Sequence, residues 1–99
     1  MKDIISKLNK VFDNRVRLGI MSLLVVNDWI DFPTLKELLD ITDGQLASNI
    51  KALEKHKFIE VRKQFIGKKP NTSYSVTLLG RKAFNNHLNA LEQLLKMRE

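Results

Sequence analysis

Cationic side chains are concentrated in one stretch of this chain. Segment 45–71 carries seven Lys and Arg residues against two Glu, which places +5 of the net charge of +6 in about a quarter of the sequence. The cations are Lys51, Lys55, Lys57, Arg62, Lys63, Lys68 and Lys69. Lysines also guard exposed strand edges, so some of them could be no more than a solvated edge. Charge scattered for solubility would not concentrate in this way, and the pattern favours a surface that binds nucleic acid.

Polar side chains that could recognise bases lie in the same stretch. The carboxamides of Gln45 and Asn49 have the geometry for bidentate contacts to adenine, and the Ser48 hydroxyl suits base edges or phosphate. Lys51 and Lys55 favour phosphate contacts, which position a protein without reading sequence. Gln45 has a competing role, because a Gln near a helix start can be occupied in capping its own backbone.

Two helix-start signals precede these residues and must position them. Thr34-Leu35-Lys36-Glu37 and Thr42-Asp43-Gly44-Gln45 both match the capping box, in which a Thr hydroxyl and a Glu or Gln side chain satisfy each other's backbone donors. Two starts eight residues apart force a helix of about two turns, a tight turn and a new helix. That is the outline of a helix-turn-helix.

The second of these helices is predicted to run over about 43–57. Its buried stripe consists of Leu46, Ile50 and Leu53, at helical spacing. The opposite face carries the small, polar and cationic side chains of Gly44, Ser48, Lys51 and Lys55. An ordinary surface helix would more often mix Glu and Lys in i,i+4 pairs, so this face is suited to an anionic partner.

After Phe58 the apolar period changes from 3.6 to 2, which predicts strands. Ile59, Val61 and Phe65 alternate with polar residues, and the alternation returns at Tyr74, Val76 and Leu78. Between them, 66–72 contains Gly67, Pro70 and two adjacent lysines, and is predicted as a loop. The pair forms a hairpin with a basic tip, over about 62–72.

Helices are predicted on both sides of this region. Apolar residues at helical spacing indicate a first helix over 3–12, and Asp13-Asn14 interrupts it and can cap a second one. A short extended piece fits 29–33, where Pro33 interrupts the pattern. Thr77 is a candidate N-cap for a last helix through Met97, with an apolar stripe at Phe84, Leu88, Leu91 and Leu95.

Composition excludes several classes of function. The absence of Cys excludes disulfides, zinc–thiolate sites and thiol nucleophiles. His56 and His87 are isolated and indicate surface or helix-end positions, and neither a catalytic constellation nor a Gly-rich phosphate loop is present. We therefore expect no metal, no cofactor and no enzyme activity. With no membrane-spanning or signal segment in the sequence, the chain is expected to be a single cytoplasmic domain over 1–99.

The predicted order of helix, helix, short strand, helix-turn-helix, basic hairpin and helix resembles the winged-helix fold (α-α-β-α-α-β-β-α, mainly α with a small β-hairpin). The sequence is similar to the MarR/ArsR-like group of small transcriptional regulators over nearly its whole length. Three segments carry the resemblance: Asn14-Arg15-Val16-Arg17-Leu18-Gly19-Ile20, Leu46-Ala47-Ser48-Asn49-Ile50-Lys51-Ala52-Leu53-Glu54-Lys55 and Val76-Thr77-Leu78-Leu79-Gly80-Arg81. The sequence departs from the group at Lys57, where many members have Gly.

The resemblance implies a regulator that places helix 43–57 in the major groove of duplex DNA and the basic wing on the backbone or in the minor groove. It also implies a homodimer on an inverted repeat, with no small-molecule effector specified. The dimer interface is expected on the terminal helices, at Ile4, Ile5, Leu8, Phe84, Leu88, Leu91, Leu94 and Leu95. The alternative for these residues is simple packing of the first helix against the last one within one chain. The alternative is a winged-helix module that docks its basic face on an acidic protein without specific DNA readout.

Overall fold

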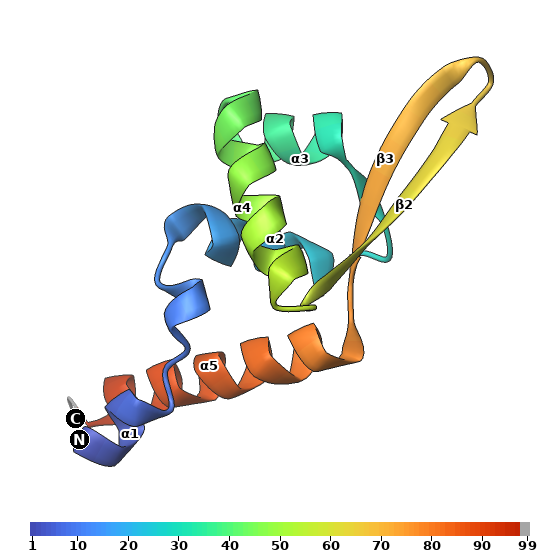
Figure 1. The fold of residues 1–99 in the computed structure, drawn as a ribbon. Coiled ribbons are helices and arrows are strands. Elements are labelled where there is room, and N and C mark those ends of the chain that lie inside the picture. The colour runs from blue at the N-terminus through green and yellow to red at the C-terminus, as the bar shows by residue number, and fades with distance from the viewer. Residues whose placement is uncertain (98–99) are drawn as a thin grey trace.

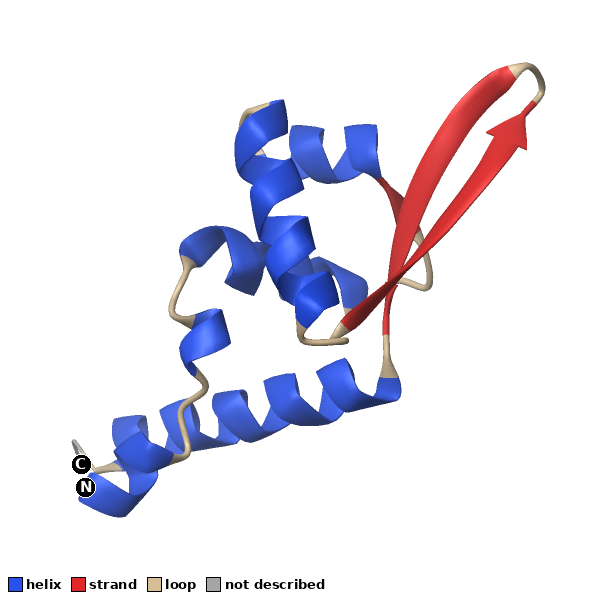
Figure 2. Cartoon of the chain, viewed as in Figure 1, coloured by secondary structure: helices blue, strands red, loops and turns tan. Residues whose placement is uncertain are grey.

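The computed structural model describes residues 1–97 as a mainly helical chain with a small antiparallel sheet (Figure 1). The elements are α1 (Lys2–Ser6), η1 (Lys10–Phe12), α2 (Arg15–Leu24), β1 (Ile30–Asp31), α3 (Phe32–Leu39), α4 (Asp43–Lys55), β2 (Ile59–Ile66), β3 (Lys69–Val76) and α5 (Leu78–Lys96). This order confirms the predicted winged-helix arrangement, and Figure 2 shows the β2–β3 hairpin projecting beyond the helices. Among residues 1–97, no helix has the length and apolar character needed to cross a membrane.

β3 is the central strand of the sheet, with β1 and β2 antiparallel on its two sides. β2 and β3 pair over their full lengths, from Ile59 opposite Val76 to Ile66 opposite Lys69. The connection between them is a two-residue turn that begins with Gly67, whose φ of 63° is readily adopted only by glycine. The longer loop predicted over 66–72 is therefore wrong, because the tight turn lets strand pairing continue to the tip.

The core lies where α2, α3, α4 and the start of α5 meet the base of the sheet (Figure 1). Its buried residues are Phe12, Ile20, Met21, Leu24, Ile30, Leu35, Leu46, Ile50, Leu53, Phe58, Ile59, Tyr74 and Phe84. Burying one side chain of this size contributes about 1.5–3 kcal/mol. This cluster therefore provides most of the stabilisation that holds the helix-turn-helix and the hairpin in one orientation.

The helix-turn-helix is formed by α3 and α4. The second predicted capping box is confirmed: Gln45 N donates to Thr42 Oγ1 and Thr42 N donates to Gln45 Oε1, both at 3.1 Å. The first predicted box is wrong, because α3 starts earlier and Asp31 caps it by accepting from Thr34 N at 3.0 Å. Pro33 favours this earlier start, since a proline in the first turn removes a donor that would have no partner. The hydrogen bonds from Thr34 hold the pKa of the Asp31 carboxyl below its ordinary value.

The N-terminal segment differs from the single helix predicted over 3–12. The chain breaks after α1, and Asn9 adopts an extended backbone from which its N–H donates to His87 Nδ1 at 3.0 Å. Asn9 Oδ1 then accepts from Val11 N and starts η1. The break places Phe12 in the core, with ring centroids 5.5 Å from Phe58 and 5.3 Å from Phe84, while α1 packs on α5. Periodicity alone could not reveal that one apolar pattern serves two separate packing surfaces.

His87 is buried with 3% of its surface exposed, although the sequence indicated a surface or helix-end position. Burial lowers the pKa of this imidazole, and the nearby Asp13 carboxylate opposes that effect. The unfolded chain therefore binds more protons than the folded chain just below pH 6.5, the ordinary value for histidine. We expect the contribution of His87 to the free energy of unfolding to be constant above pH 6.5. Below pH 6.5 this contribution should decrease, and the protein should become less stable.

Denaturant unfolding on both sides of pH 6.5 tests this expectation. His87→Gln retains an acceptor for the Asn9 N–H but does not titrate, so its stability should change by no more than about 1 kcal/mol at neutral pH. Its profile should also lose the decline below pH 6.5. An unchanged profile in His87→Gln would assign the pH dependence to other groups.

The first turn of α5 is fastened to the turn between α4 and β2 by direct contacts. Thr77 Oγ1 accepts from Gly80 N at 2.9 Å and donates to Lys57 O at 2.7 Å, while Thr77 N donates to Phe58 O at 3.0 Å. Lys57, which stands where the resemblance favours Gly, takes the left-handed conformation with φ of 61°. Gly80 lies directly against the Phe58 backbone, and any Cβ at this position would overlap the Phe58 carbonyl.

The molecule is elongated, with extents of 55 × 25 × 21 Å. Its Cα radius of gyration is 15.0 Å, whereas a compact domain of this length has about 13 Å. The excess length comes from two parts at opposite ends of the molecule (Figure 1). One is the projecting β2–β3 hairpin, and the other is the C-terminal half of α5, which is accompanied by α1. Both described chain ends lie at this distal end.

Candidate nucleic-acid interface

α4 presents the predicted two faces. Leu46, Ile50 and Leu53 are buried in the core with at most 3% exposure. The opposite face is exposed, and its members are Gly44, Gln45, Ala47, Ser48, Lys51, Glu54 and Lys55. Among the described residues neither Lys51 nor Lys55 forms an ion pair, so both ammonium groups are available to an external anion.

Ser48 is the polar residue of this face whose side chain is least committed. Its hydroxyl donates to Gln45 O at 3.3 Å, a long hydrogen bond within the helix that leaves the acceptor lone pairs of Ser48 Oγ accessible. Gln45 is also exposed, but its Oε1 accepts from both the backbone N–H and the hydroxyl of Thr42. A base contact through Gln45 Oε1 therefore competes with the capping box.

Asn49 is held within the protein at both ends of its carboxamide. Its Oδ1 accepts from Arg17 Nε at 3.0 Å and its Nδ2 donates to Gln45 O at 2.8 Å. Arg17, on α2, also donates to Val11 O at 3.2 Å, so the guanidinium joins α2, α4 and the segment before α2. A bidentate contact from Asn49 to adenine would have to replace both of its bonds. No spacing signal in the sequence connects Arg17 with Asn49.

The β2–β3 hairpin has two distinct faces, because alternate residues of a strand point to opposite sides and directly paired residues share a side. One face carries the cross-strand pairs Val61/Tyr74, Lys63/Thr72 and Phe65/Pro70. The first two pairs join residues of α4 around a groove of about 320 Å³. The groove is lined by Phe32, Ala47, Ile50, Lys51, Glu54, Val61, Lys63, Thr72 and Tyr74. Lys51 and Lys63 thus lie on opposite walls of one concave surface.

The other face of the hairpin carries Arg62 and Asn71, on the same side of the sheet as Asp31 of β1. The Arg62 guanidinium lies over the Trp29 ring, 4.2 Å from its centroid, in a cation–π arrangement. Beyond it, Asn71 Nδ2 donates to Asp31 Oδ2 at 3.1 Å. The structure therefore separates Arg62 from Lys63, although the sequence placed both in one set of DNA-binding residues. Arg62 does not share a face with the α4 cations.

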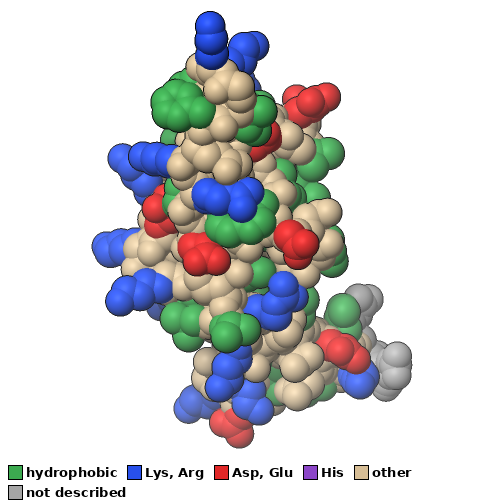
Figure 3. All heavy atoms as spheres, turned by 90° about the vertical axis from the view of Figure 1, so that its right-hand side faces the viewer, with side chains coloured by type: hydrophobic (Ala, Val, Ile, Leu, Met, Phe, Trp, Pro, Cys, Tyr) green, Lys and Arg blue, Asp and Glu red, His purple; other side chains and the backbone are tan. Residues whose placement is uncertain are grey.

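The charge distribution follows this arrangement. Figure 3 shows Lys and Arg side chains along the left edge of the molecule and at the top, where the hairpin ends. Lys68 lies in the turn and Lys69 begins β3, and both are exposed. Lys51 and Lys55 on α4 and Lys68 and Lys69 at the hairpin tip are all exposed, and we call these four cations the basic border.

Comparison with known proteins gives this border a context. Residues 16–95 match the model of a family described as winged helix DNA-binding domain, which is more than half of the chain. This chain belongs to that family. In the winged-helix fold, α4 occupies the position of the second helix of the helix-turn-helix, and the β2–β3 hairpin is the wing.

Individual relatives match this chain over most of its length. An uncharacterized protein of Methanocaldococcus jannaschii is 38% identical over 87 residues, which cover 88% of this chain and 95% of the relative. The solved structure of a transcriptional regulator homologue from Pyrococcus horikoshii is 28% identical, covers 99% of this chain and 95% of that one, and gives a TM-score of 0.87. A MarR-family structure from Porphyromonas gingivalis shares the fold, with 24% identity, 88% and 80% coverage, and a TM-score of 0.67.

The terminal helices of the winged helix domain carry the residues expected at a dimer interface. Ile5, Leu88 and Leu95 are exposed, at 52%, 41% and 60%. Half-buried positions are occupied by Ile4, Leu8, Leu91 and Leu94. Phe84 is only 2% exposed and belongs to the core, so its expected place at an interface is wrong. The i,i+4 spacing grouped Phe84 with Leu88. The buried face of α5 instead runs through Gly80, Phe84, His87 and Ala90.

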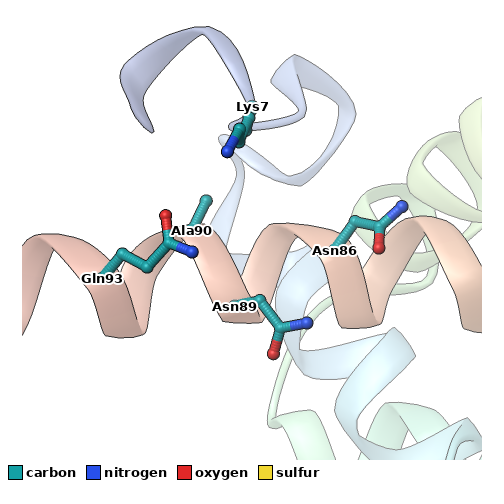
Figure 4. A pocket seen from close by; sticks show the side chains of 5 residues that line it. All are labelled: Lys7, Asn86, Asn89, Ala90 and Gln93. Atoms are coloured by element: carbon teal, nitrogen blue, oxygen red, sulfur yellow. The ribbon is translucent and has the colours of Figure 1, made fainter. Parts of the chain in front are cut away.

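A hollow of about 360 Å³ lies between α1 and α5, on the same part of the molecule (Figure 4). It is lined by Lys7, Asn86, Asn89, Ala90 and Gln93, and Figure 4 shows Lys7 facing α5 across it. The lining offers amide hydrogen bonds and one cation but no carboxylate or imidazole. Within residues 1–97 no group of three or more His, Cys, Asp or Glu residues is arranged to hold a metal.

Proposed function

We propose that this protein is a transcriptional regulator that binds duplex DNA with sequence preference, placing α4 in the major groove and the wing on the adjacent backbone or minor groove. The observation that carries the proposal is the position of Lys51 and Lys63 on opposite walls of the groove between α4 and the wing. A phosphate backbone passing over that groove would meet a cation from each element. The regulator homologue of Pyrococcus horikoshii, which matches nearly the whole chain, supports the same role.

The exposed side chains fall into two groups, those that contact phosphates and those that contact bases. Phosphate contacts are assigned to Lys51, Lys55, Lys63, Lys68 and Lys69, all exposed and none in an ion pair among the described residues. Ser48 is the leading candidate for base contact. Gln45 can contact a base only when its Oε1 gives up the hydrogen bond from Thr42 N. Asn49 acts mainly by fixing the position of α4 against Arg17.

We further propose that the protein acts as a homodimer on an inverted repeat. Exposed Leu88 and Leu95 on a helix that extends beyond the compact part of the molecule support this assembly. An isologous pair across a two-fold axis would cover both patches and set two recognition helices about 34 Å apart, one turn of DNA.

The salt dependence of binding tests the DNA-binding function. For a dimer that neutralises on the order of eight phosphates, a plot of log K against the logarithm of the salt concentration should have a slope near −7, because each phosphate contributes about −0.9. Lys51→Ala with Lys63→Ala removes four cations from the dimer, so the slope should become shallower by about 3 to 4 for any duplex sequence. Fluorescence anisotropy of a labelled random duplex, titrated at several salt concentrations, measures it.

The matched control is Lys2→Ala with Lys96→Ala, which removes the same charge from the distal ends of α1 and α5. That variant should keep most of the parent slope. Binding that is insensitive to salt in the parent protein would favour an acidic protein as the partner of the basic face. Equal flattening in both double variants would mean that only the net charge matters.

A further inference from the structure

The tip of the wing carries large apolar side chains that no other part of the described chain covers. Phe65 is 73% exposed and Ile66 is 61% exposed, whereas the same strand begins with buried Ile59. The alternation of β2 predicted Phe65 on a half-buried face, and the structure places it beyond the reach of the core. Exposed strand ends normally carry charged or turn-forming residues, so an exposed aromatic here calls for a partner.

Phe65 is presented rigidly. It stands directly opposite Pro70 in the β2–β3 register, and the strands close one residue later in the two-residue turn at Gly67. Proline fixes its own backbone angle, and the tight turn leaves no slack between the strands. Phe65 and Pro70 therefore form a narrow apolar wedge at the end of a paired hairpin, which we call the wing wedge.

The surroundings of the wing wedge indicate an anionic partner. Lys63 lies two residues before Phe65 on the same face, and Lys68 and Lys69 form the tip. An apolar protein pocket would not require one lysine on the face of the phenyl ring, a second in the turn beside it and a third on the other face of the same strand end. A base step in duplex DNA has this combination, because stacked apolar base faces lie between two rows of phosphates.

The length of the wing suits a minor groove. From Val61, the first residue of β2 that lines the groove beside α4, five residues lead to Ile66, or about 17 Å of strand. Half a turn of DNA is also about 17 Å, which is the offset between a major groove and the next minor groove. With α4 in a major groove, the tip is thus within reach of the minor groove beside it.

We propose that the wing wedge inserts Phe65 into a base step of the minor groove, partly unstacks it and bends the duplex. This inference rests on the proposed DNA-binding function and adds to it a specificity that does not depend on base hydrogen bonds. Pyrimidine–purine steps unstack most easily, so sites with such a step under the wing should bind more tightly. Lys68 and Lys69 would hold the phosphates on both sides of the opened step.

Energy transfer along a duplex of about 30 base pairs tests the inference. The duplex is one selected by the parent protein from a random pool, with donor and acceptor dyes on its ends. Saturating parent protein should raise the transfer efficiency by an amount that corresponds to a bend of about 20–90°. Phe65→Ala should bind about tenfold more weakly and, once saturated, should leave the efficiency near that of free DNA. Phe65→Leu should keep most of the bend, because leucine also serves as a wedge.

Controls separate the wedge from other effects. Phe65 is exposed, so Phe65→Ala should retain the circular dichroism and unfolding midpoint of the parent. Val26→Ala shortens another exposed apolar side chain, outside the wing, and should bend the duplex as the parent does. A 2-aminopurine placed at successive steps should brighten at one step with the parent and at none with Phe65→Ala.

The outcomes are distinguishable. A straight duplex in the saturated parent complex, or an equal bend with Phe65→Ala, would overturn the wedge and leave the DNA-binding function standing. Absence of salt-dependent binding to any duplex would overturn both proposals. Binding of the parent, but not of Phe65→Ala, to anionic phospholipid vesicles with no effect of the substitution on DNA would assign the wing tip to a membrane surface and also overturn the wedge.

Discussion

Gly80→Ala is expected to cost more than about 4 kcal/mol of folding free energy, or to prevent folding altogether. The methyl group would overlap the carbonyl oxygen of Phe58 and lie 2.8 Å from its C and Cα atoms. These are backbone atoms in a turn whose Lys57 already takes a left-handed conformation, so the turn cannot retreat without losing its bonds to Thr77. Relief requires that α5 move away as a whole.

The size of the effect follows from what α5 carries. Phe84 and His87 enter the core from this helix, and Phe84 contacts Phe12 edge to face. A displaced α5 would open that contact and the His87 bond to Asn9 together. A domain of this length has a total stability near the lower end of about 5–15 kcal/mol, so losing this joint removes most of it.

Gly44→Ala is the matched control, since it makes the same chemical change in the first turn of α4. A Cβ at Gly44 meets nothing within 4 Å, so alanine there should be neutral or stabilise the fold by up to about 1 kcal/mol. Urea unfolding followed by circular dichroism compares the two variants with the parent. Similar midpoints for all three proteins would show that α5 can shift away from the Phe58 backbone at little cost in stability.

Gly80 also shows what the sequence could and could not predict. The order of elements was predictable, because caps and periodicity are local: Asn14, Thr42 and Thr77 each cap the expected helix, and the alternation after Phe58 marks β2. The segment around Gly80 was recognisable only by resemblance. Glycine is needed at position 80 because the start of α5 lies against the backbone at Phe58, and this tertiary contact is not visible in the local sequence.

The incorrect predictions have the same origin. Helical spacing over 3–12 is real, but Asn9 breaks the helix to reach His87, 78 residues away. The box at Thr34 has the right residue types, yet Asp31 and Pro33 outcompete it by starting α3 earlier. Such choices depend on which partner the folded chain supplies, and a window of sequence does not contain that partner.

The candidate site was predictable by position and less so by role. All nine proposed DNA-binding residues lie on α4 or on the wing. The sequence indicated the capping box that occupies Gln45, and the structure confirms it. The sequence could not show that Asn49 is bound to Arg17 or that Arg62 faces Trp29. Packing between elements decides which of these side chains remain free. For this reason we assign the main base contact to Ser48.

Leu95→Glu is expected to convert the proposed homodimer to monomers and to weaken binding to an inverted repeat by about a hundredfold or more. Leu95 is 60% exposed on the distal half of α5, so a carboxylate there is solvated in the monomer but would be buried without a counter-charge in the isologous dimer. Binding of two half-sites by two linked recognition helices provides the affinity that the monomer lacks. Non-specific binding should fall far less, because each monomer keeps its basic border.

Asn85→Glu is the matched control, since it adds the same charge to an exposed position on the same helix. Sedimentation of the parent, Leu95→Glu and Asn85→Glu, alone and with a selected duplex, measures assembly, and circular dichroism should show unchanged helix content in all three. If the parent sediments as a monomer at concentrations that saturate its DNA site, the extended end of α5 has another purpose, and a single half-site is the whole target.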